Sequence, residues 1–326
     1  MSIIIDDVKL AAQLILQGQL CAIPTETVYG LAADASNHQA IRRVFEAKGR
    51  PVDHPLIVHV ANLESAKLWV SEFPDWAEQL AKACWPGPLT IVAKRSELAS
   101  DLITGSQDTV AVRVPNHPKT LELLSILSNA GCSGLVAPSA NQFGHVSPTN
   151  ASHVASDLGE YLIQNHDVIL NGGSCAVGIE STIVLATSKA PKILRPGAIT
   201  EELIQSITGL DLDSDLKDSP KVSGALASHY APKANVQVVT EITGRDFESN
   251  SGFIALAQVP TPQSLTRLAA PNSEVEFAAD LYQAMRKADE LNLTTIYIVT
   301  PQAIEIGRAI VDRVAKAAHK KPGERE

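Results

Sequence analysis

Four cations occupy positions in this sequence that suit an anionic ligand. Lys48 and Arg50 flank a glycine and precede a proline, at the end of a stretch with helical spacing of apolar residues. Because glycine suits the left-handed conformation that ends a helix and proline cannot continue one, both cations are predicted to lie at a helix exit. Arg113 and Arg195 fall in the runs TVAVRV and KILR, which are typical of strands.

Four cations in one domain suit a polyanion of the triphosphate type. Opposite charges about 4 Å apart attract with about 4 kcal/mol at an effective dielectric constant of about 20. The same residues would also serve as structural salt bridges, and Lys48 and Arg50 would complement a helix C-terminus by up to about 1 kcal/mol. The composition leaves these alternatives open.

Two predicted strands each carry a polar side chain on an otherwise apolar pattern. The run from Leu56 to Val60 alternates with a period of two, which places His59 on the face opposite both of these residues. In TVAVRV the same period places Thr109 and Arg113 on one face and the valines on the other. Since an unpaired buried charge is strongly destabilising, Arg113 needs a carboxylate partner, either from the protein or from a ligand.

Two loops after predicted strands are dense in polar side chains. PTETVYGLAADA, residues 24–35, lies where α/β proteins bind ligands, although turn chemistry alone would also explain its composition. In LVAPSANQFGHVSPTNASHV, residues 135–154, Ser147 is predicted to cap a helix whose first residue is Pro148. The N–H groups at such a helix start suit an anion, and the same residues would also serve as a cap that holds no ligand.

Predicted strands and helices alternate along the chain, which indicates the α/β class. Residues 1–207 carry the polar motifs and are predicted to form one domain. A polar, acidic stretch and the sequence HYAPK indicate a linker over residues 208–234. Residues 235–326 are predicted to form a small layered α/β domain. Its strand candidates are residues 236–239, 253–257 and 295–299, and its last helix candidate spans 303–318.

The composition narrows the class of protein. A chain of 326 residues, 45% of them hydrophobic, is typical of a globular protein with room for two domains. The formal net charge of -9 argues against a protein that coats nucleic acid through bulk electrostatics. The four cysteines are scattered without a Cys-x-x-Cys pair, and neither a signal peptide nor a membrane-spanning run is evident. We therefore expect buried free thiols, a cytoplasmic location and no membrane partner.

A series of motifs carries a family resemblance. The chain lacks the phosphate-binding loop, the dinucleotide-binding glycine pattern and the common hydrolase and metalloprotease motifs. It contains, in order, PTETVYGL, KGRP with PLIVHV, WPGPLT, TVAVRVP, APSAN followed by SPT, GIEST, LRPG and HYAPK. In these motifs it resembles the threonylcarbamoyl-AMP synthase family (YrdC/Sua5-like), and HYAPK with the following domain resembles the longer Sua5 form.

The resemblance implies a fold and a reaction. The fold would be a YrdC-like twisted mixed sheet around a large concave cavity, followed by a small Rossmann-like α/β C-terminal domain. The reaction would join L-threonine, bicarbonate and ATP into L-threonylcarbamoyl-AMP and release pyrophosphate, which is the work of a nucleotidyltransferase. The product would pass to the tRNA-threonylcarbamoyl transferase complex, which forms N6-threonylcarbamoyladenosine. A direct contact with tRNA or double-stranded RNA is left open.

The resemblance also implies a role for each matching residue. L-threonine would be held by Thr27, His59, Arg113, the backbone of Ala137, and Ser181. ATP would be held by Lys48, Arg50, His54, Thr109, Ser139, Asn141, Ser147 and Arg195. Lys48 and Arg50, with Mg2+ carried by the ATP, would neutralise the leaving pyrophosphate and are the expected catalytic residues. No enzyme nucleophile is expected, because the threonine amine and then the carbamate attack.

The linker departs from the family pattern. Ala227 stands where an aromatic residue can cover the nucleotide, so a lid would rely on His229, Tyr230 or the backbone.

Two other functions remain as alternatives. An RNA-binding module would show a steep salt dependence of its affinity for tRNA. A carbamoyl-transfer relative would resemble the YrdC-like domains of hydrogenase maturation proteins.

Overall fold

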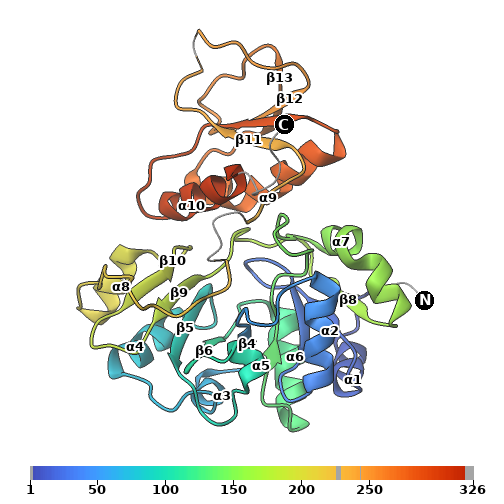
Figure 1. The fold of residues 1–326 in the computed structure, drawn as a ribbon, viewed down its shortest axis with the longest axis vertical. Coiled ribbons are helices and arrows are strands. Elements are labelled where there is room, and N and C mark those ends of the chain that lie inside the picture. Colours follow the sequence, from blue (N-terminus) through green and yellow to red (C-terminus); the bar gives the residue numbers. More distant parts are fainter. Residues whose placement is uncertain (1–2, 225–228, 243, 320–326) are drawn as a thin grey trace.

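The computed structural model describes residues 3–224, 229–242 and 244–319. Figure 1 shows a larger and a smaller unit stacked along the long axis of the molecule. Each unit is built on its own β-sheet.

The larger unit is a mixed sheet, with ten strands among the described residues. From edge to edge the strands are β1 (Ile4–Ile5), β8 (Val168–Leu170), β2 (Cys21–Ile23), β3 (Gly30–Asp34), β7 (Leu135–Val136), β4 (Ile57–His59), β6 (Thr109–Arg113), β5 (Leu89–Lys94), β9 (Thr182–Leu185) and β10 (Lys192–Arg195). Strand β4 runs parallel to β6 and β5 runs parallel to β9, whereas β5 and β6 are antiparallel. The predicted mixed α/β fold is confirmed.

Helices cover this sheet, as Figure 1 shows. They are α1 (Val8–Leu16), α2 (His38–Lys48), α3 (Leu63–Lys67), α4 (Asp75–Cys84), α5 (Asp101–Thr104), α6 (Pro118–Asn129), α7 (Ala151–Gln164) and α8 (Glu201–Thr208). The predicted end of α2 is confirmed, because Gly49 adopts the left-handed conformation with a φ of 60°. Lys48 and Arg50 therefore lie at the helix exit.

The strand alternation that the sequence predicts is also present. Val58 of β4 and Val112 of β6 are fully buried in the main apolar core. His59 and Arg113 point to the other face, where they line a cavity. The sheet thus places these two polar side chains on the face opposite the main apolar core, where they are available to a ligand.

One predicted boundary is wrong. Ser147 does not cap a helix, because α7 begins at Ala151 and its cap is Asn150, whose side-chain oxygen accepts the N–H of His153 at 2.9 Å. Asn is as good an N-cap as Ser, and a serine followed by proline gave the more conspicuous signal. The helix start expected at Ser147 therefore lies three residues further along the chain.

The smaller unit is an all-parallel sheet in the order β11 (Asn235–Val238), β14 (Thr295–Ile298), β12 (Ser251–Ile254) and β13 (Leu265–Ala269). Helices α9 (Glu274–Glu290) and α10 (Gly307–Ala318) lie between this sheet and the larger unit (Figure 1). The Rossmann-like class is confirmed. The sequence reasoning did not identify β13, and it placed the start of α10 at residue 303, ahead of the observed start at Gly307.

Two expectations from composition can be compared with the structure. All four cysteines are buried free thiols, as expected. No helix within the described ranges has both the length and the apolar character needed to cross a bilayer.

Candidate functional site

A cavity lies where the linker meets the face of the large sheet that carries His59 and Arg113. Its lining includes many residues that the sequence assigned to substrates or to a lid. They are Thr27, Lys48, Arg50, His59, Arg113, Ala137, Ser139, Asn141, Ser181, Arg195, His229 and Tyr230. The fold therefore brings to one place residues that are far apart in the sequence.

Thr27, His59 and Arg113 form a group that we call the strand-end cluster. His59 and Arg113 are paired in the register of β4 and β6, so their side chains emerge side by side on one face. Arg113 Nη1 donates a hydrogen bond of 2.9 Å to Oγ1 of Thr27, which lies in the loop after β2. All three side chains are buried. The cluster presents a guanidinium, an imidazole and a hydroxyl at one point of the cavity wall.

The protein supplies part of the counter-charge that Arg113 needs. Glu26 Oε1 lies 2.8 Å from Arg113 Nη2, close enough for an ion pair but without the alignment of a hydrogen bond. The other oxygen of Glu26 accepts the backbone N–H of Asn116 at 2.9 Å. Among the described residues, nothing accepts a hydrogen bond from Nε or Nη2 of Arg113. These unused donors suit the two-pronged grip that arginine takes on a carboxylate.

The surroundings of His59 fix its charge state. Burial, together with the nearby charge of Arg113, lowers the pKa of His59 to about 3. The imidazole is therefore neutral near neutral pH, with Nδ1 at 3.2 Å from the carbonyl oxygen of Ile57. When Nδ1 donates to that carbonyl, Nε2 is the nitrogen that can accept a hydrogen bond from a ligand.

Ala137 and Ser181 are partly engaged within the protein. The N–H of Ala137 donates to the carbonyl of Ile57 at 3.2 Å, so its own carbonyl is the group that it can offer to a ligand amine. Ser181 Oγ lies 2.8 Å from Thr90 Oγ1 and accepts a hydrogen bond of 3.1 Å from Arg195. When Thr90 donates within that pair, Ser181 keeps its hydroxyl hydrogen for a ligand.

Three cations line the neighbouring wall and bond mainly to carbonyl oxygens. Lys48 Nζ donates to the carbonyl of Asn141 at 2.7 Å, and Arg50 Nη2 donates to that of Pro55 at 2.9 Å. Nε and Nη2 of Arg195 both donate to one carbonyl of the GIEST segment, at 3.0 Å and 2.9 Å. Carbonyl dipoles orient a cation without cancelling its charge, so this wall is electropositive.

The crowding of these cations changes their proton affinity. Burial, followed by the neighbouring charge of Arg50, holds the pKa of Lys48 well below its usual range. Burial lowers the pKa of Arg50 to about 10, and it also lowers the pKa of Arg195. Since like charges at short range oppose each other, the wall is suited to a ligand with several negative charges.

Three residues that the sequence assigned to ATP lie away from the cavity lining. Thr109, at the start of β6, lines a separate hollow together with Val222 of the linker. His54 is partly buried, and the edge of its ring contacts Phe143 with 5.3 Å between the ring centres. Ser147 is fully buried and donates a hydrogen bond of 2.6 Å to a carboxylate oxygen of Glu180. The side-chain partner of Ser147 is thus a protein carboxylate.

The HYAPK segment closes one side of the cavity. His229 and Tyr230 are buried on its wall, and the N–H of Ala231 fastens the segment by donating to the carbonyl of Gly144 at 3.1 Å. Tyr230 has a φ of 63°, which is uncommon for a residue other than glycine. Within the described ranges its buried hydroxyl has no hydrogen-bond partner. Ala227, at which the sequence places a missing aromatic contact, lies outside the described residues.

Phe143 and Glu180 are among the cavity-wall residues that the sequence reasoning did not assign to a ligand. Phe143 lies near the guanidinium of Arg50, whose Cζ is 5.7 Å from the ring centre. Glu180 is bonded by Tyr282 of α9 and Arg313 of α10, so the smaller unit reaches this wall. A signal was present, because Arg313 interrupts the apolar stripe of α10. A charge in such a stripe calls for a buried partner.

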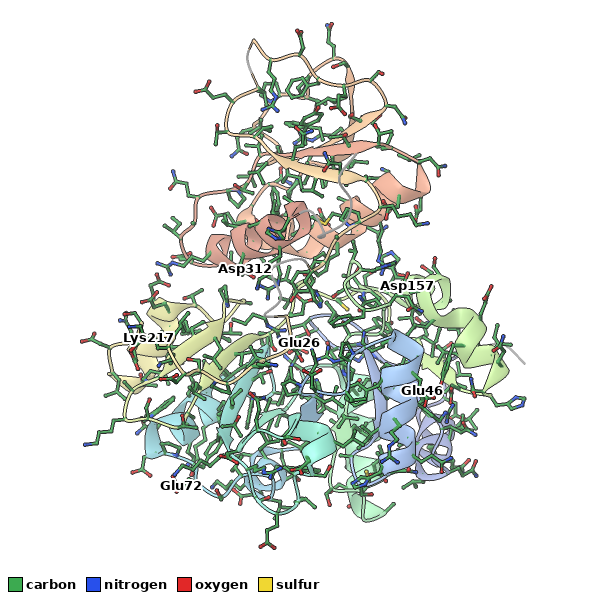
Figure 2. All side chains as sticks on the ribbon, in the orientation of Figure 1. Glu26, Glu46, Glu72, Asp157, Lys217 and Asp312 are labelled. Carbon is green, nitrogen blue, oxygen red and sulfur yellow. The ribbon has the colours of Figure 1, made fainter. Side chains whose placement is uncertain are left out.

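Carboxylates near the cavity offer little to a metal ion. Within the described ranges, no group of three or more His, Cys, Asp or Glu side chains comes together as a metal site would require. Glu26 and Glu180 are each paired with an arginine. Figure 2 shows Glu26 in the part of the larger unit that faces the smaller one.

Two family models match the chain. One, described as telomere recombination (Sua5, YciO and YrdC), matches residues 13–197, and the other, described as the C-terminal domain of threonylcarbamoyl-AMP synthase, matches residues 199–319. The chain is 36% identical to the threonylcarbamoyl-AMP synthase of Pyrococcus abyssi, over 95% of this chain and 94% of the relative. It is also 36% identical to the Bacillus subtilis protein of that name, over 94% and 92%.

A solved structure is similar over nearly the whole chain. It is the crystal structure of Pyrococcus abyssi Sua5 complexed with L-threonine, with a TM-score of 0.84 and 34% identity over 97% of this chain and 98% of that chain. Both units of the structure are thus found together in a relative. The chain belongs to the Sua5/YciO/YrdC family, in the form that carries the C-terminal domain of threonylcarbamoyl-AMP synthases.

Proposed function

We propose that this protein is an L-threonylcarbamoyl-AMP synthase, which joins L-threonine, bicarbonate and ATP and releases pyrophosphate. The observation that carries the proposal is that one cavity presents two kinds of site side by side. The strand-end cluster suits an amino-acid carboxylate, and the wall of Lys48, Arg50 and Arg195 suits a triphosphate. The names of the full-length relatives, and the L-threonine bound to the Pyrococcus abyssi protein, support this assignment.

For L-threonine, the proposal uses polar atoms of the cavity wall. Nε and Nη2 of Arg113 would hold the carboxylate. The buried charge of Arg113 would then have two carboxylate partners, the ligand and Glu26. The carbonyl of Ala137 would accept from the amine, and Nε2 of His59 would accept from the amine or the hydroxyl. Because the imidazole is neutral, it would not repel the ammonium form of the substrate.

For ATP, the phosphates would lie along the wall of Lys48, Arg50 and Arg195, beside Ser139 and Asn141. Asn141 Oδ1 is buried and has no hydrogen-bond donor among the described residues, so it is available to a nucleotide. Mg2+ would enter as part of the MgATP substrate and share the neutralisation of the phosphates.

The chemistry would then proceed in two displacements. The amine nitrogen of threonine attacks the carbon of bicarbonate, a C–N bond forms, and water leaves with the carbamate as product. A carbamate oxygen attacks the α-phosphorus of ATP, and the bond to the bridging oxygen of pyrophosphate breaks. Neither step needs an enzyme nucleophile. The protein contributes by positioning the reactants and by neutralising the leaving pyrophosphate through Lys48 and Arg50.

The decisive experiment is pyrophosphate release from MgATP by the full chain, with L-threonine and bicarbonate added separately and together. We expect release only when both are present, together with a product whose mass is that of L-threonylcarbamoyl-AMP. Release without threonine would indicate an ATPase. A lack of release, combined with a steep salt dependence of tRNA binding, would favour the RNA-binding alternative.

We further propose that the product passes to the tRNA-threonylcarbamoyl transferase complex in the cytoplasm. A mixed anhydride of a carbamate and a phosphate is prone to hydrolysis, so an acceptor enzyme must take it soon after release. The net charge of -9 does not favour strong direct binding of tRNA by this chain. Transfer of labelled threonine to tRNA, with and without added complex, would test this step.

A further inference from the structure

The smaller unit reaches the cavity wall through α9 and α10, which Figure 1 shows at the junction. Tyr282 of α9 and Arg313 of α10 are fully buried. Tyr282 Oη and Arg313 Nε donate hydrogen bonds of 2.9 Å and 2.8 Å to one carboxylate oxygen of Glu180. Ser147 Oγ donates to the other oxygen at 2.6 Å. We call these four residues the junction cluster.

Glu180 is an unexpected wall residue for a cavity that suits anions. It shares the lining with Lys48 and Arg195. Although burial alone would raise the pKa of Glu180, the charges of Arg313 and Arg195 lower it to about 2. The carboxylate is therefore fully ionised at neutral pH. Without a partner it would repel the phosphates of ATP.

Arg313 supplies the compensating charge and also supports the rest of the wall. Its Cζ lies 5.2 Å from the ring centre of Tyr230, which lines the cavity. One turn further along α10, Lys316 Nζ donates to the carbonyl of Gly224 at 2.8 Å, and the Lys316 carbonyl accepts the N–H of His229 at 3.3 Å. Helix α10 thus contacts the wall at the Glu180 carboxylate, at the tyrosine ring and at both described flanks of the linker.

We propose that Arg313, assisted by Tyr282, is a positioning residue for ATP. By neutralising and orienting Glu180, it allows the cavity to accept a polyanion. The smaller unit therefore helps to form the ATP site without touching the nucleotide. This inference rests on the proposed function, because it places ATP against the wall that Glu180 shares.

A merely structural role is the competing explanation, since a buried ion pair can serve only to hold two units together. The two roles predict opposite changes in ATP affinity for Glu180→Gln. Removal of the guanidinium leaves Glu180 with only the neighbouring charge of Arg195 to compensate it and should weaken ATP binding, whereas removal of the Glu180 charge leaves extra positive charge and should strengthen it. If Arg313 and Glu180 formed only a structural tie, either change would loosen the junction and weaken binding.

The test measures ATP affinity of the full chain by calorimetry with Mg2+, after thermal unfolding has shown that each variant is folded. We expect Arg313→Met to weaken binding by about 10-fold to 100-fold and Glu180→Gln to strengthen it by about 3-fold to 10-fold. The double variant should lie within about threefold of wild type, as should Arg313→Lys, which keeps the charge.

A matched control is available on the same helix. Arg308 Nη1 lies 2.7 Å from a carboxylate oxygen of Glu202 in the larger unit, at a partly exposed position. Because solvent screens such a pair, Arg308→Met should change ATP affinity by less than about twofold. An equal effect of Arg308→Met and Arg313→Met would show that loosening the junction is sufficient, and it would overturn the proposal.

Other outcomes are equally decisive. Weaker ATP binding by Glu180→Gln, or a change of less than about threefold in Arg313→Met, would overturn the proposal. If Arg313→Met does not fold, Glu180→Gln decides by its sign, since tighter binding supports the proposal and weaker binding refutes it. Binding is measured without L-threonine and bicarbonate. Failure of this inference is therefore distinct from failure of the reaction, which threonine-dependent release of pyrophosphate tests.

Discussion

The strand-end cluster and the junction cluster differ in how completely their members satisfy one another. In the strand-end cluster, Nε and Nη2 of Arg113 have no hydrogen-bond acceptor among the described residues. In the junction cluster, the Glu180 carboxylate accepts from Ser147, Tyr282 and Arg313. Buried polar groups are nearly always hydrogen bonded. Unused donors therefore indicate a place for a ligand, and a saturated group indicates part of the supporting frame.

The two clusters also differ in origin. His59 and Arg113 are neighbours on paired strands of one sheet. Thr27, which accepts a hydrogen bond from Arg113, lies in the loop between β2 and β3. The junction cluster joins two units, since Ser147 and Glu180 belong to the larger and Arg313 belongs to the smaller. Substitutions in the first cluster should therefore change substrate binding most, and those in the second should act through charge and stability.

The largest effect is expected from Arg113→Ala. It removes the donors assigned to the threonine carboxylate and leaves Glu26 without its partner, so kcat/KM for L-threonine should fall by about 1000-fold. The KM for ATP should change by less than about threefold, because the phosphates lie on another wall. Steady-state pyrophosphate release at varied substrate concentrations measures both values.

Arg113→Lys is the matched control for that change. It keeps the positive charge beside Glu26 but loses the planar fork, so an intermediate loss of about 100-fold is expected. Thermal unfolding of both variants separates a loss of binding from a loss of folded protein. A loss of less than about tenfold in the alanine variant would show that Arg113 belongs to the frame and not to the threonine site.

The electropositive wall can be tested through the proton of Lys48. Its pKa is held well below the usual range by burial and by Arg50, and a bound triphosphate should raise it again. ATP binding should therefore take up protons at pH values that lie between the pKa of Lys48 in the free protein and its pKa in the complex. Calorimetry in two buffers of different ionisation enthalpy measures this uptake. Lys48→Met should abolish it and weaken ATP binding by about 100-fold.

Lys119→Met provides the control. This partly exposed lysine pairs with Asp6 at 2.8 Å and is not part of the cavity lining, so its removal should alter neither the proton uptake nor the ATP affinity. Equal uptake in wild type and Lys48→Met would assign the proton to another group and would contradict the electrostatic description of this wall.

Local pattern was sufficient to predict the elements that carry the strand-end cluster. Gly49 and Pro51 correctly predicted where α2 ends. Alternation in β4 and β6 correctly predicted that His59 and Arg113 point away from the face that carries the valines. These features depend on backbone geometry and on side-chain period, which the sequence displays directly. The family motifs then brought Thr27 and Ser181 to the same site, and the structure places both on the cavity wall.

Local sequence patterns could not predict the junction cluster. Ser147 has the residue type of a helix cap, and only its long-range contact with Glu180 shows that its hydroxyl is used elsewhere. Arg313 is 133 residues away from Glu180 in the sequence, and the packing of one unit on the other decides that they meet. Thr109 likewise faces the predicted side of its strand, yet it lines a separate hollow with Val222 of the linker.

Acid should affect the two clusters in different pH ranges. The pKa of His59 is about 3 in the folded protein, below its unfolded value of about 6.5, so the unfolded state binds more protons as the pH falls through that range. This histidine alone should lower the free energy of unfolding by ~2 kcal/mol between about pH 7 and 5. The Glu180 carboxyl, with a pKa of about 2, contributes stability above its unfolded value of about 4.3 and loses it only below that value.

Urea unfolding at several pH values compares His59→Gln with Glu180→Gln. The first variant should show a flatter profile between about pH 7 and 5, and the second should keep the wild-type slope there even if its overall stability differs. Parallel profiles for wild type and His59→Gln would mean that folding does not lower the pKa of His59. That result would contradict the desolvated, neutral imidazole that we assign to the threonine site as a hydrogen-bond acceptor.

The smallest effect on ATP is expected from Ser147→Ala, and its matched partner is Ser139→Ala. Ser139 lines the cavity, so loss of its hydroxyl should raise the KM for ATP by about tenfold. Ser147 donates to Glu180, which keeps two other donors, so its loss should lower the free energy of unfolding by about 1 kcal/mol and change the KM for ATP by less than about threefold. If Ser147→Ala instead raised the KM as much as Ser139→Ala, the Ser147 hydroxyl would have to leave Glu180 when ATP binds. The junction cluster would then be part of the ligand site, and saturation in this structure would no longer distinguish frame from site.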